Sequence, residues 1–328
     1  MPLGTNHIIV TEVQNFVPEL WSDEVVASYK ANLVVRNLVR VLNHKGKKGD
    51  TIRIPTPTRG AVSTKAAETQ VTLIQHGTDT GIVVAIDKHK EYSRLIEDIV
   101  DVQALGSLRR FYTDDGGYAV AKRVDRELIL QAARSALGGG TIVEDATTGN
   151  IDSTSTFTNA RIGDDSAAWD PTGTGNAVDL SDLGLRRFVK RLDQVDAPMA
   201  GRFLVVSPNV KADMMGMARF TEQAFTGESG KGNTIRNGLV GDTYAVSVFV
   251  TNQLQQVEDA GATADQDLIL MFQRDGLLLV EQMGIRTQEQ YKQEYLASLW
   301  TADTIYGTAG LRGTSILAIV VPSSFTDG

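Results

Sequence analysis

The chain has 328 residues and a formal net charge of −8, with 42% hydrophobic and 22% charged residues. This composition fits a folded protein with one large domain or two closely packed ones. No stretch approaches the roughly 20 apolar residues of a membrane-spanning helix. The first residues lack the basic segment and apolar core of a secretory signal, so none is expected. The absence of cysteine excludes disulfides, thiolate nucleophiles and cysteine-based metal centres.

The first predicted element is a helix over residues 18–43. Apolar side chains recur along it at three-to-five residue spacing, and Pro18 stands near its start. Asp23 and Glu24 suit the positive end of the helix dipole. We expect the helix to end before Gly46, because glycine readily adopts the backbone conformation that closes a helix.

The apolar period then changes from helical to two. We expect strands at 51–55, 70–75 and 82–87, and Pro55 and Pro57 confine the first strand to the edge of a sheet. A ribbon of this kind has little to bury and is marginal in water when isolated. The sequence therefore predicts a long hairpin-like excursion that packs on another surface.

Residues 92–137 return to a helical pattern, which ends at three consecutive glycines. The pair Gly116-Gly117 inside this pattern marks either a break or a close approach by another backbone. A helix of this length is expected to form the backbone of the fold. Its apolar stripe falls at every fourth position, at Val120, Val124, Leu128 and Ala132.

Residues 138–178 are rich in glycine, threonine, serine, asparagine and aspartate, which indicates a long surface loop or a small inserted β-element. Helices and strands then alternate, which predicts an α+β layered fold. No internal repeat of solenoid period is present. The expected helices cover 180–193 and 209–220, and the expected strands cover 202–207, 245–251, 268–272, 277–282 and 314–321.

Charge is distributed unevenly along the chain. Residues 36–60 carry seven basic side chains against the single acid Asp50, whereas residues 138–182 carry eight acids against the single base Arg161. The asymmetry suggests two faces that meet different surroundings. Composition alone favours the plainer interpretation, a solvated basic turn beside an acidic loop.

No motif indicates catalysis, a cofactor or a metal. The segment GESGKGNT (227–234) lacks the spacing of a phosphate-binding loop, and GTGNAV (173–178) lacks the third glycine of a dinucleotide fingerprint. The acidic pair Asp164-Asp165 is interpreted as solvated. The histidines are scattered without metal-ligand spacing, at His7, His44, His76 and His89. We therefore expect a protein that is not an enzyme and needs no cofactor.

Four segments resemble the major capsid proteins of tailed bacteriophages. FVPELWSDEVVASYKANLVV (16–35) is similar to an amino-terminal arm of that family, and GKKGDTIRIP (46–55) to the entry into its extended loop. DKHKEYSRLIEDIVDVQA (87–104) resembles the lead into the family's long helix. DTIYGTAGLRGTSILAIVV (303–321) resembles its closing segment and final strand. Together with the order of elements, these segments extend the resemblance over most of the chain.

The resemblance implies the Hong Kong 97-type fold, an α+β fold with an extended β-hairpin loop and a long spine helix. It implies an amino-terminal arm, an extended loop, a peripheral domain and an axial domain. In this sequence these parts would be the arm at 1–50, the extended loop at 51–90, the peripheral domain at 91–178 and 301–325, and the axial domain at 179–300, with the spine helix at about 103–137 and a polar loop or insertion at 138–178.

Basic side chains are the predicted contacts with neighbouring subunits or packaged DNA. They would meet phosphates without reading base sequence, and salt bridges between subunits explain them equally well. Some relatives cross-link the extended loop through a lysine, but no partner motif accompanies the lysine in the middle of this loop, so we expect it to be solvated. The predicted contact residues are Arg36, Arg40, Lys45, Lys47, Lys48, Arg59 and Lys65.

The resemblance further implies a major capsid protein that self-assembles into pentamers and hexamers of an icosahedral shell around double-stranded DNA. Its expected partners are other copies of itself, a scaffolding protein, a portal protein, a cement protein and the packaged DNA, but no membrane. The expected location is the virion, after assembly in the host cytoplasm. The alternative is an encapsulin-like compartment, which shares this fold and encloses cargo enzymes. The long amino-terminal arm favours the phage interpretation.

Overall fold

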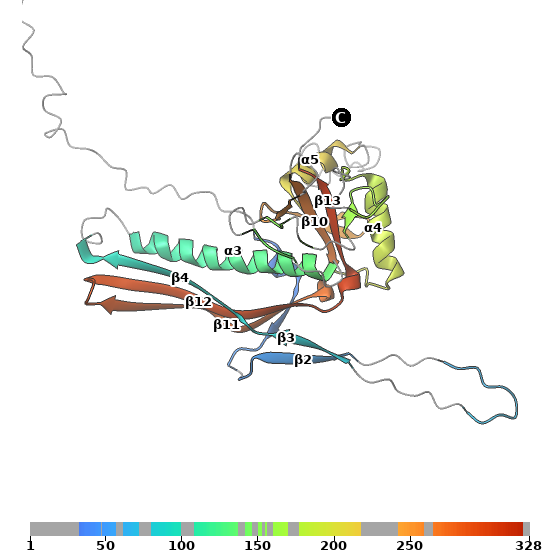
Figure 1. The fold of residues 1–328 in the computed structure, drawn as a ribbon, viewed down its shortest axis with the longest axis horizontal. Coiled ribbons are helices and arrows are strands. Elements are labelled where there is room, and N and C mark those ends of the chain that lie inside the picture. Colours follow the sequence, from blue (N-terminus) through green and yellow to red (C-terminus); the bar gives the residue numbers. More distant parts are fainter. Residues whose placement is uncertain are drawn as a thin grey trace, which may run out of the picture.

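A computed structural model describes residues 33–46, 48–56, 62–71, 80–99, 108–136, 142–145, 150–152, 155, 160–169, 177–217, 242–258 and 265–323. The molecule is α+β, as expected. The long helix α3 (Leu108–Ala136) runs along one elongated sheet, and a second sheet with two shorter helices lies toward the carboxyl end of α3 (Figure 1). A two-stranded ribbon leads away from both sheets.

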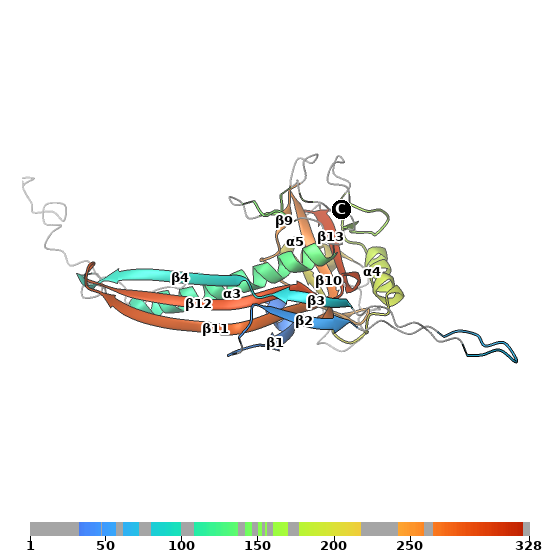
Figure 2. The same ribbon diagram turned by 60° about the horizontal axis from the view of Figure 1, so that its bottom comes forward.

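The elongated sheet has four strands and is built around a long antiparallel hairpin. A short helix, α1 (Val35–Leu38), precedes the strand that pairs in parallel with this hairpin. Figure 2 shows the sheet and α3 extending together in the same direction. In spatial order the strands are β1 (Arg40–Asn43), β11 (Leu277–Lys292), β12 (Ala297–Gly310) and β4 (Lys88–Glu97).

The second sheet has seven strands, and its central strand β10 (Gln266–Gln273) is buried at every residue. Helices α4 (Asp182–Gln194) and α5 (Pro208–Gly216) pack their apolar faces on this sheet. The other strands are β5 (Arg161–Ile162), β13 (Ile316–Pro322), β6 (Arg202–Val206), β8 (Val246–Val250), β7 (Asp242–Thr243) and β9 (Gln256–Val257).

Two short 3-10 turns, Arg274–Gly276 and Gly313–Ser315, connect strands of the two sheets. The ribbon consists of β2 (Thr51–Thr56) and β3 (Thr80–Ala85), which pair antiparallel over their full length. The expected strands at 51–55 and 82–87 are thereby confirmed, with small shifts at their ends.

Helix α3 confirms the predicted apolar stripe. Val120, Val124, Leu128 and Ala132 are all buried, against the elongated sheet and in the main core. The two helices of the second half are also confirmed. Their first turns are capped by serine hydroxyls, because Ser181 accepts the backbone N–H of Gly184 and Ser207 accepts that of Val210.

Two helix predictions are wrong in part. Residues 40–43, expected at the end of a helix, form strand β1, because parallel pairing with β11 satisfies their backbone groups. Residues 92–97, expected at the start of the long helix, belong to strand β4. The face of β4 toward α3 carries Lys88 and Lys90 beside the single aromatic Tyr92, so the sequence showed no regular alternation of polar and apolar residues there. Residues 18–32 lie outside the described part of the chain.

Other expectations need adjustment. Residues 70 and 71 are not in a strand, and the rest of the expected strand at 70–75 lies outside the described residues. The polar region 138–178 contains the short strand β5 and isolated bridges such as Glu144 with Ile151, which favours the alternative of a small β-element.

Two strands belong to a different sheet from the one that their expected domain ranges imply. Strand β11 was expected within the axial range 179–300, but it pairs with β12 and β1 in the sheet beneath α3. Strand β13 was expected with the peripheral part, but it pairs with β10 in the seven-stranded sheet. The chain therefore crosses between the two sheets after β10 and again before β13.

The pair Gly116-Gly117 provides a matched test of helix packing. A Cβ on Gly116 would lie 2.6 Å from the Trp300 ring and 2.7 Å from the Tyr92 ring, whereas a Cβ on Gly117 would meet nothing within 4 Å. Gly116→Ala should therefore destabilise the fold by about 1–3 kcal/mol through overpacking. Gly117→Ala should stabilise it by about 0.5–1 kcal/mol through helix propensity.

Urea unfolding of the unassembled chain, followed by circular dichroism, measures both changes. Equal effects of the two substitutions would show that the aromatic contact does not determine which glycine is needed.

Candidate functional site

The ribbon packs on the rest of the chain through one face only. Ile52, Ile54 and Ile82 are partly buried, and together with the buried Val84 they cover the side chains of Leu278 and Val280 in β11. The other face is open, and Val83 is 54% exposed. One face of the ribbon is therefore packed on β11, and no described part of the chain covers the other face.

Beyond the ribbon, every residue in the stretch 62–71 is exposed. The side chain of Val62 is fully exposed and that of Val71 is 66% exposed. Figure 1 places this stretch far from both sheets. These two valines stand apart and form no apolar patch, so the stretch is marked by its full exposure and not by apolar surface.

The predicted basic residues do not form one surface. Arg36 and Lys45 meet at Glu281, with Arg36 Nε donating to Glu281 Oε1 at 3.1 Å and Lys45 Nζ lying 3.7 Å from Oε2. Arg40, at the start of β1, lies 3.9 Å from Asp275 in the 3-10 turn before β11. This ion pair is separate from the one at Glu281. Much of this positive charge is thus balanced within the chain.

The remaining predicted residues are dispersed. Lys48 is exposed next to Gly49, and Lys65 is exposed within the stretch 62–71. Lys47 and Arg59 lie outside the described residues. Among the five predicted residues that the structure describes, it brings together only Arg36 and Lys45.

A buried carboxylate that the sequence analysis missed fixes the chain before β1. Asp125 of α3 is fully buried and accepts the backbone N–H groups of Val34 and Arg36 at 3.3 Å and 2.9 Å. Helix α1 has no side-chain cap of its own, so Asp125 supplies it from another element. Burial raises the pKa of Asp125, and these backbone hydrogen bonds partly offset that increase.

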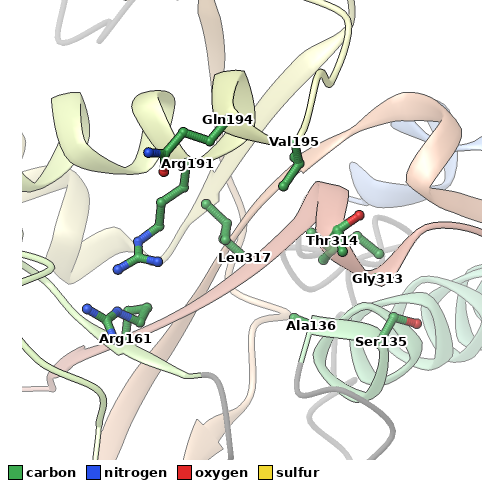
Figure 3. A pocket seen from close by; sticks show the side chains of 10 residues that line it. Ser135, Ala136, Arg161, Arg191, Gln194, Val195, Gly313, Thr314 and Leu317 are labelled. Atoms are coloured by element: carbon green, nitrogen blue, oxygen red, sulfur yellow. The ribbon is translucent and has the colours of Figure 1, made fainter. Parts of the chain in front are cut away.

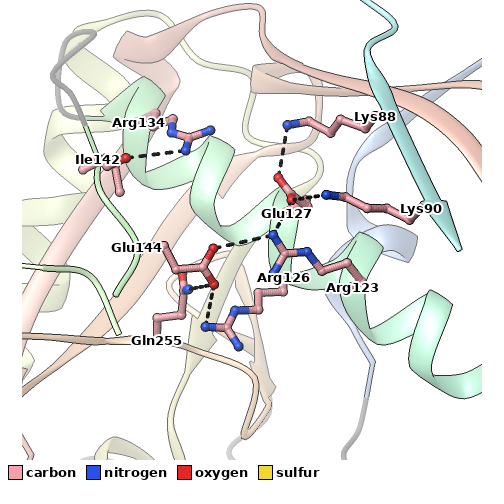
Figure 4. Close-up of polar contacts among 9 residues, drawn as sticks. All are labelled: Lys88, Lys90, Arg123, Arg126, Glu127, Arg134, Ile142, Glu144 and Gln255. Atoms are coloured by element: carbon pink, nitrogen blue, oxygen red, sulfur yellow. Dashed lines mark hydrogen bonds and ion pairs between the residues drawn. The ribbon is translucent and has the colours of Figure 1, made fainter. Parts of the chain in front are cut away.

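A second buried carboxylate joins α3 to β4. Glu127 lies 3.1 Å from Lys88 Nζ, 3.7 Å from Lys90 Nζ and 2.7 Å from an Arg123 guanidinium nitrogen (Figure 4). On the same side of α3, Arg126 pairs with Glu144 at 2.6 Å, which ties the residues after the helix to it. These ion pairs hold the long helix to the sheet and to the following segment.

The charges around Glu127 determine its ionisation. Burial alone raises the pKa of this carboxyl, but the attraction of Lys88 and Arg123 and their hydrogen bonds outweigh burial and lower its pKa below the ordinary value. Glu127 is therefore ionised near neutral pH, and its ion pairs are fully formed there.

A cavity of about 470 Å³ lies between the end of α3, helix α4 and the turn before β13 (Figure 3). Two arginines line it, and both pair with one aspartate: Arg161 Nε lies 2.6 Å and Arg191 Nε 2.7 Å from the carboxylate of Asp165. The other lining groups include the hydroxyls of Ser135 and Thr314 but no base that could activate them. This cavity offers no catalytic arrangement.

In the described ranges no cluster of three or more histidine, aspartate or glutamate side chains could hold a metal ion. Within the same ranges, no helix combines the length and apolar character needed to span a membrane. Among the described residues, the candidate contact surface is thus the open face of the ribbon together with the exposed stretch 62–71.

Comparison with solved structures identifies the fold. The capsid of the cyanophage P-SCSP1u has a TM-score of 0.71 and 16% sequence identity, covering 98% of this chain and 97% of that chain. A structure from Mycobacterium phage Che8 has a TM-score of 0.69 and 23% identity, covering 93% and 97%. The capsid of Ralstonia phage GP4 has a TM-score of 0.65 and 14% identity, covering 99% and 100%.

The chain has the fold of phage capsid proteins. This confirms, at the level of the fold, the resemblance drawn from the four sequence segments. No protein-family model and no curated protein matches the chain by sequence. The capsid fold is therefore carried by the arrangement of elements more than by residue identity.

The buried ion pairs of the capsid fold give a pH-dependent prediction. Glu127→Gln should lower the free energy of unfolding at pH 7 by about 3 kcal/mol, because it leaves three cations without their carboxylate. Since the pKa of Glu127 is lowered in the folded state, its stabilisation is present above the unfolded pKa of about 4.3 and is lost as pH falls through the lower folded pKa.

Chemical unfolding of both proteins at pH 7 and at a pH below the unfolded pKa of about 4.3 measures this difference in free energy, which should narrow at the lower pH. Glu91→Gln, at an exposed position of β4 beside Lys90, is the control and should change stability by less than about 0.5 kcal/mol. If the free energies of unfolding of Glu127→Gln and of the parent differ by the same amount at both pH values, the role assigned to Glu127 is contradicted.

Proposed function

We propose that this chain is the major capsid protein of a tailed bacteriophage. Many copies would assemble as pentamers and hexamers into an icosahedral shell that encloses the double-stranded DNA genome. The observation that carries this proposal is that one face of the ribbon and all of the stretch 62–71 are left uncovered by the described part of the chain. A subunit with such an extension is completed by contact with another copy.

The parts of the Hong Kong 97-type fold are assigned here by strand pairing. The peripheral domain would comprise α3 with the sheet of β1, β11, β12 and β4, so α3 would be the spine helix. The axial domain would comprise the seven-stranded sheet with α4 and α5. Residues 1–50 would form the arm, whose end contributes β1 to the four-stranded sheet, and 51–90 the extended loop, which ends in the first residues of β4. In this assignment the axial domains meet within each capsomer.

The ion pairs of the basic residues support a structural role for them. Because Arg36 and Lys45 already balance Glu281, they would fix the start of the extended loop more than they would bind DNA. The exposed Lys48 and Lys65 remain available for contacts with a neighbouring copy or with DNA phosphates.

The remaining partners follow from this role. A scaffolding protein would guide assembly, a portal protein would replace one capsomer, and a cement protein would bind the outer surface. The protein would act in the virion after assembly in the host cytoplasm, and it would catalyse no reaction.

Shortening the extended loop tests this function. Thr56 pairs with Thr80, so residues 57–79 can be replaced by an Asn-Gly turn that keeps β2 and β3 joined. The shortened chain should fold with a melting temperature close to that of the parent, because its core is unchanged. It should fail to form closed particles, because the contacts with neighbouring copies are removed.

Sedimentation velocity and electron microscopy of both chains, each expressed with a scaffolding protein, provide the readout. Normal particles from the shortened chain would contradict the role of the loop. Failure of the parent chain itself to form particles would contradict the proposed function.

A further inference from the structure

The free edge of strand β11 is an unusual feature of the elongated sheet. Strand β1 pairs with β11 only as far as Glu281, where His44 donates its backbone N–H to the Glu281 carbonyl. From residue 286 to Lys292, β11 pairs regularly with β12 on one side. No other described strand pairs with this half of β11.

Both faces of this half-strand are also open. Residues 285–291 are all exposed, although successive side chains point to opposite faces of the sheet. Helix α3 therefore does not cover this part of β11, and Figure 2 shows β11 at the border of the sheet. An exposed edge of this length is a template for a further strand.

The two edges of this sheet differ in charge. The opposite edge strand, β4, has the sequence KHKEYSRLIE, in which charged residues and a histidine predominate. Such an edge discourages strand addition. The open half of β11, IRTQEQY, has one cation and one anion among uncharged residues. It also has apolar surface at Ile285, which is 52% exposed, and at Tyr291, which is 47% exposed.

We propose that two copies of this chain join edge to edge through β11, antiparallel across a two-fold axis at Gln288. The two four-stranded sheets would then form one continuous sheet. This inference rests on the proposed function, because it needs neighbouring copies in a shell. The inference adds to that function a specific contact, through β11, between two neighbouring copies.

Symmetry limits the register of such a contact. Directly opposite residues in an antiparallel pair alternate between hydrogen-bonded and non-hydrogen-bonded types. A two-fold axis perpendicular to the sheet must therefore place one residue opposite its own copy, because adjacent pairs are of different type. Each candidate centre is thus a single residue.

Charge excludes two centres, and the length of the contact then selects Gln288, because centres at Thr287 or Gln290 pair fewer residues of the exposed run 285–291. A centre at Arg286 would oppose two guanidinium groups, and a centre at Glu289 would oppose two carboxylates. A centre at Gln288 places Arg286 opposite Gln290 and Thr287 opposite Glu289, which brings no like charges together. Gln288 is also the midpoint of the exposed run 285–291.

The absence of cysteine makes this register directly testable. Opposite residues in an antiparallel pair have Cα atoms about 4.5 or 5.5 Å apart, which a disulfide can bridge. Gln288→Cys, assembled under reducing conditions and then oxidised, should give covalent dimers on a non-reducing gel. The double variant Arg286→Cys/Gln290→Cys should do the same.

Thr301→Cys is the matched control. Thr301 is the direct partner of Gln288 on β12, which has β11 on one side and β4 on the other, so it cannot meet its own copy. Dimers from Gln288→Cys particles, with none from Thr301→Cys particles or from unassembled chains, would support the contact.

Intact particles that give no dimers with either Gln288→Cys or the double variant would overturn the β11 contact and leave the capsid function standing. Equal dimer formation by Thr301→Cys would overturn it as well. If Gln288→Cys alone fails to assemble, the double variant decides. Absence of particles from the parent chain would instead count against the proposed function.

Discussion

The fold depends on a four-residue segment, Leu277–Val280, in which every side chain is fully buried. Leu277 and Leu279 pack into the main core with α3, whereas Leu278 and Val280 pack beneath the ribbon. The same segment pairs with β12 on one edge and with β1 on the other. Because both faces and both edges are used, this segment fixes the spine, the ribbon and the chain before β1 relative to one another.

With distance from this segment, the described elements are progressively less buried by the rest of the chain. Buried ion pairs at Glu127 and a buried cap at Asp125 hold α3 to the strands around it. Further out, the ribbon packs on one face only, and the distal half of β11 is open on both faces and along one edge. A rigid centre with open extremities suits a subunit whose outer parts are completed by copies of itself.

The sequence predicted the elements whose burial follows a regular period. The stripe at Val120, Val124 and Leu128 predicted α3, and serine caps accompany both helices of the second half. It failed for β4, where lysines face the helix, and for the distal part of β11, where both faces are polar and exposed. Propensity and period cannot show pairing between distant strands, so β1 was also mistaken for helix. The contact role of the basic residues stays a prediction, and Glu281, which pairs with Arg36 and Lys45, lies too far along the chain to be predicted as their partner.

The measurement that tests this account most directly is electron cryo-microscopy of the chain expressed with a scaffolding protein. The account predicts closed icosahedral shells in which residues 62–71 of each copy lie against a neighbouring copy. A uniformly small, compact species would contradict it, and so would shells in which this stretch packs only against its own chain.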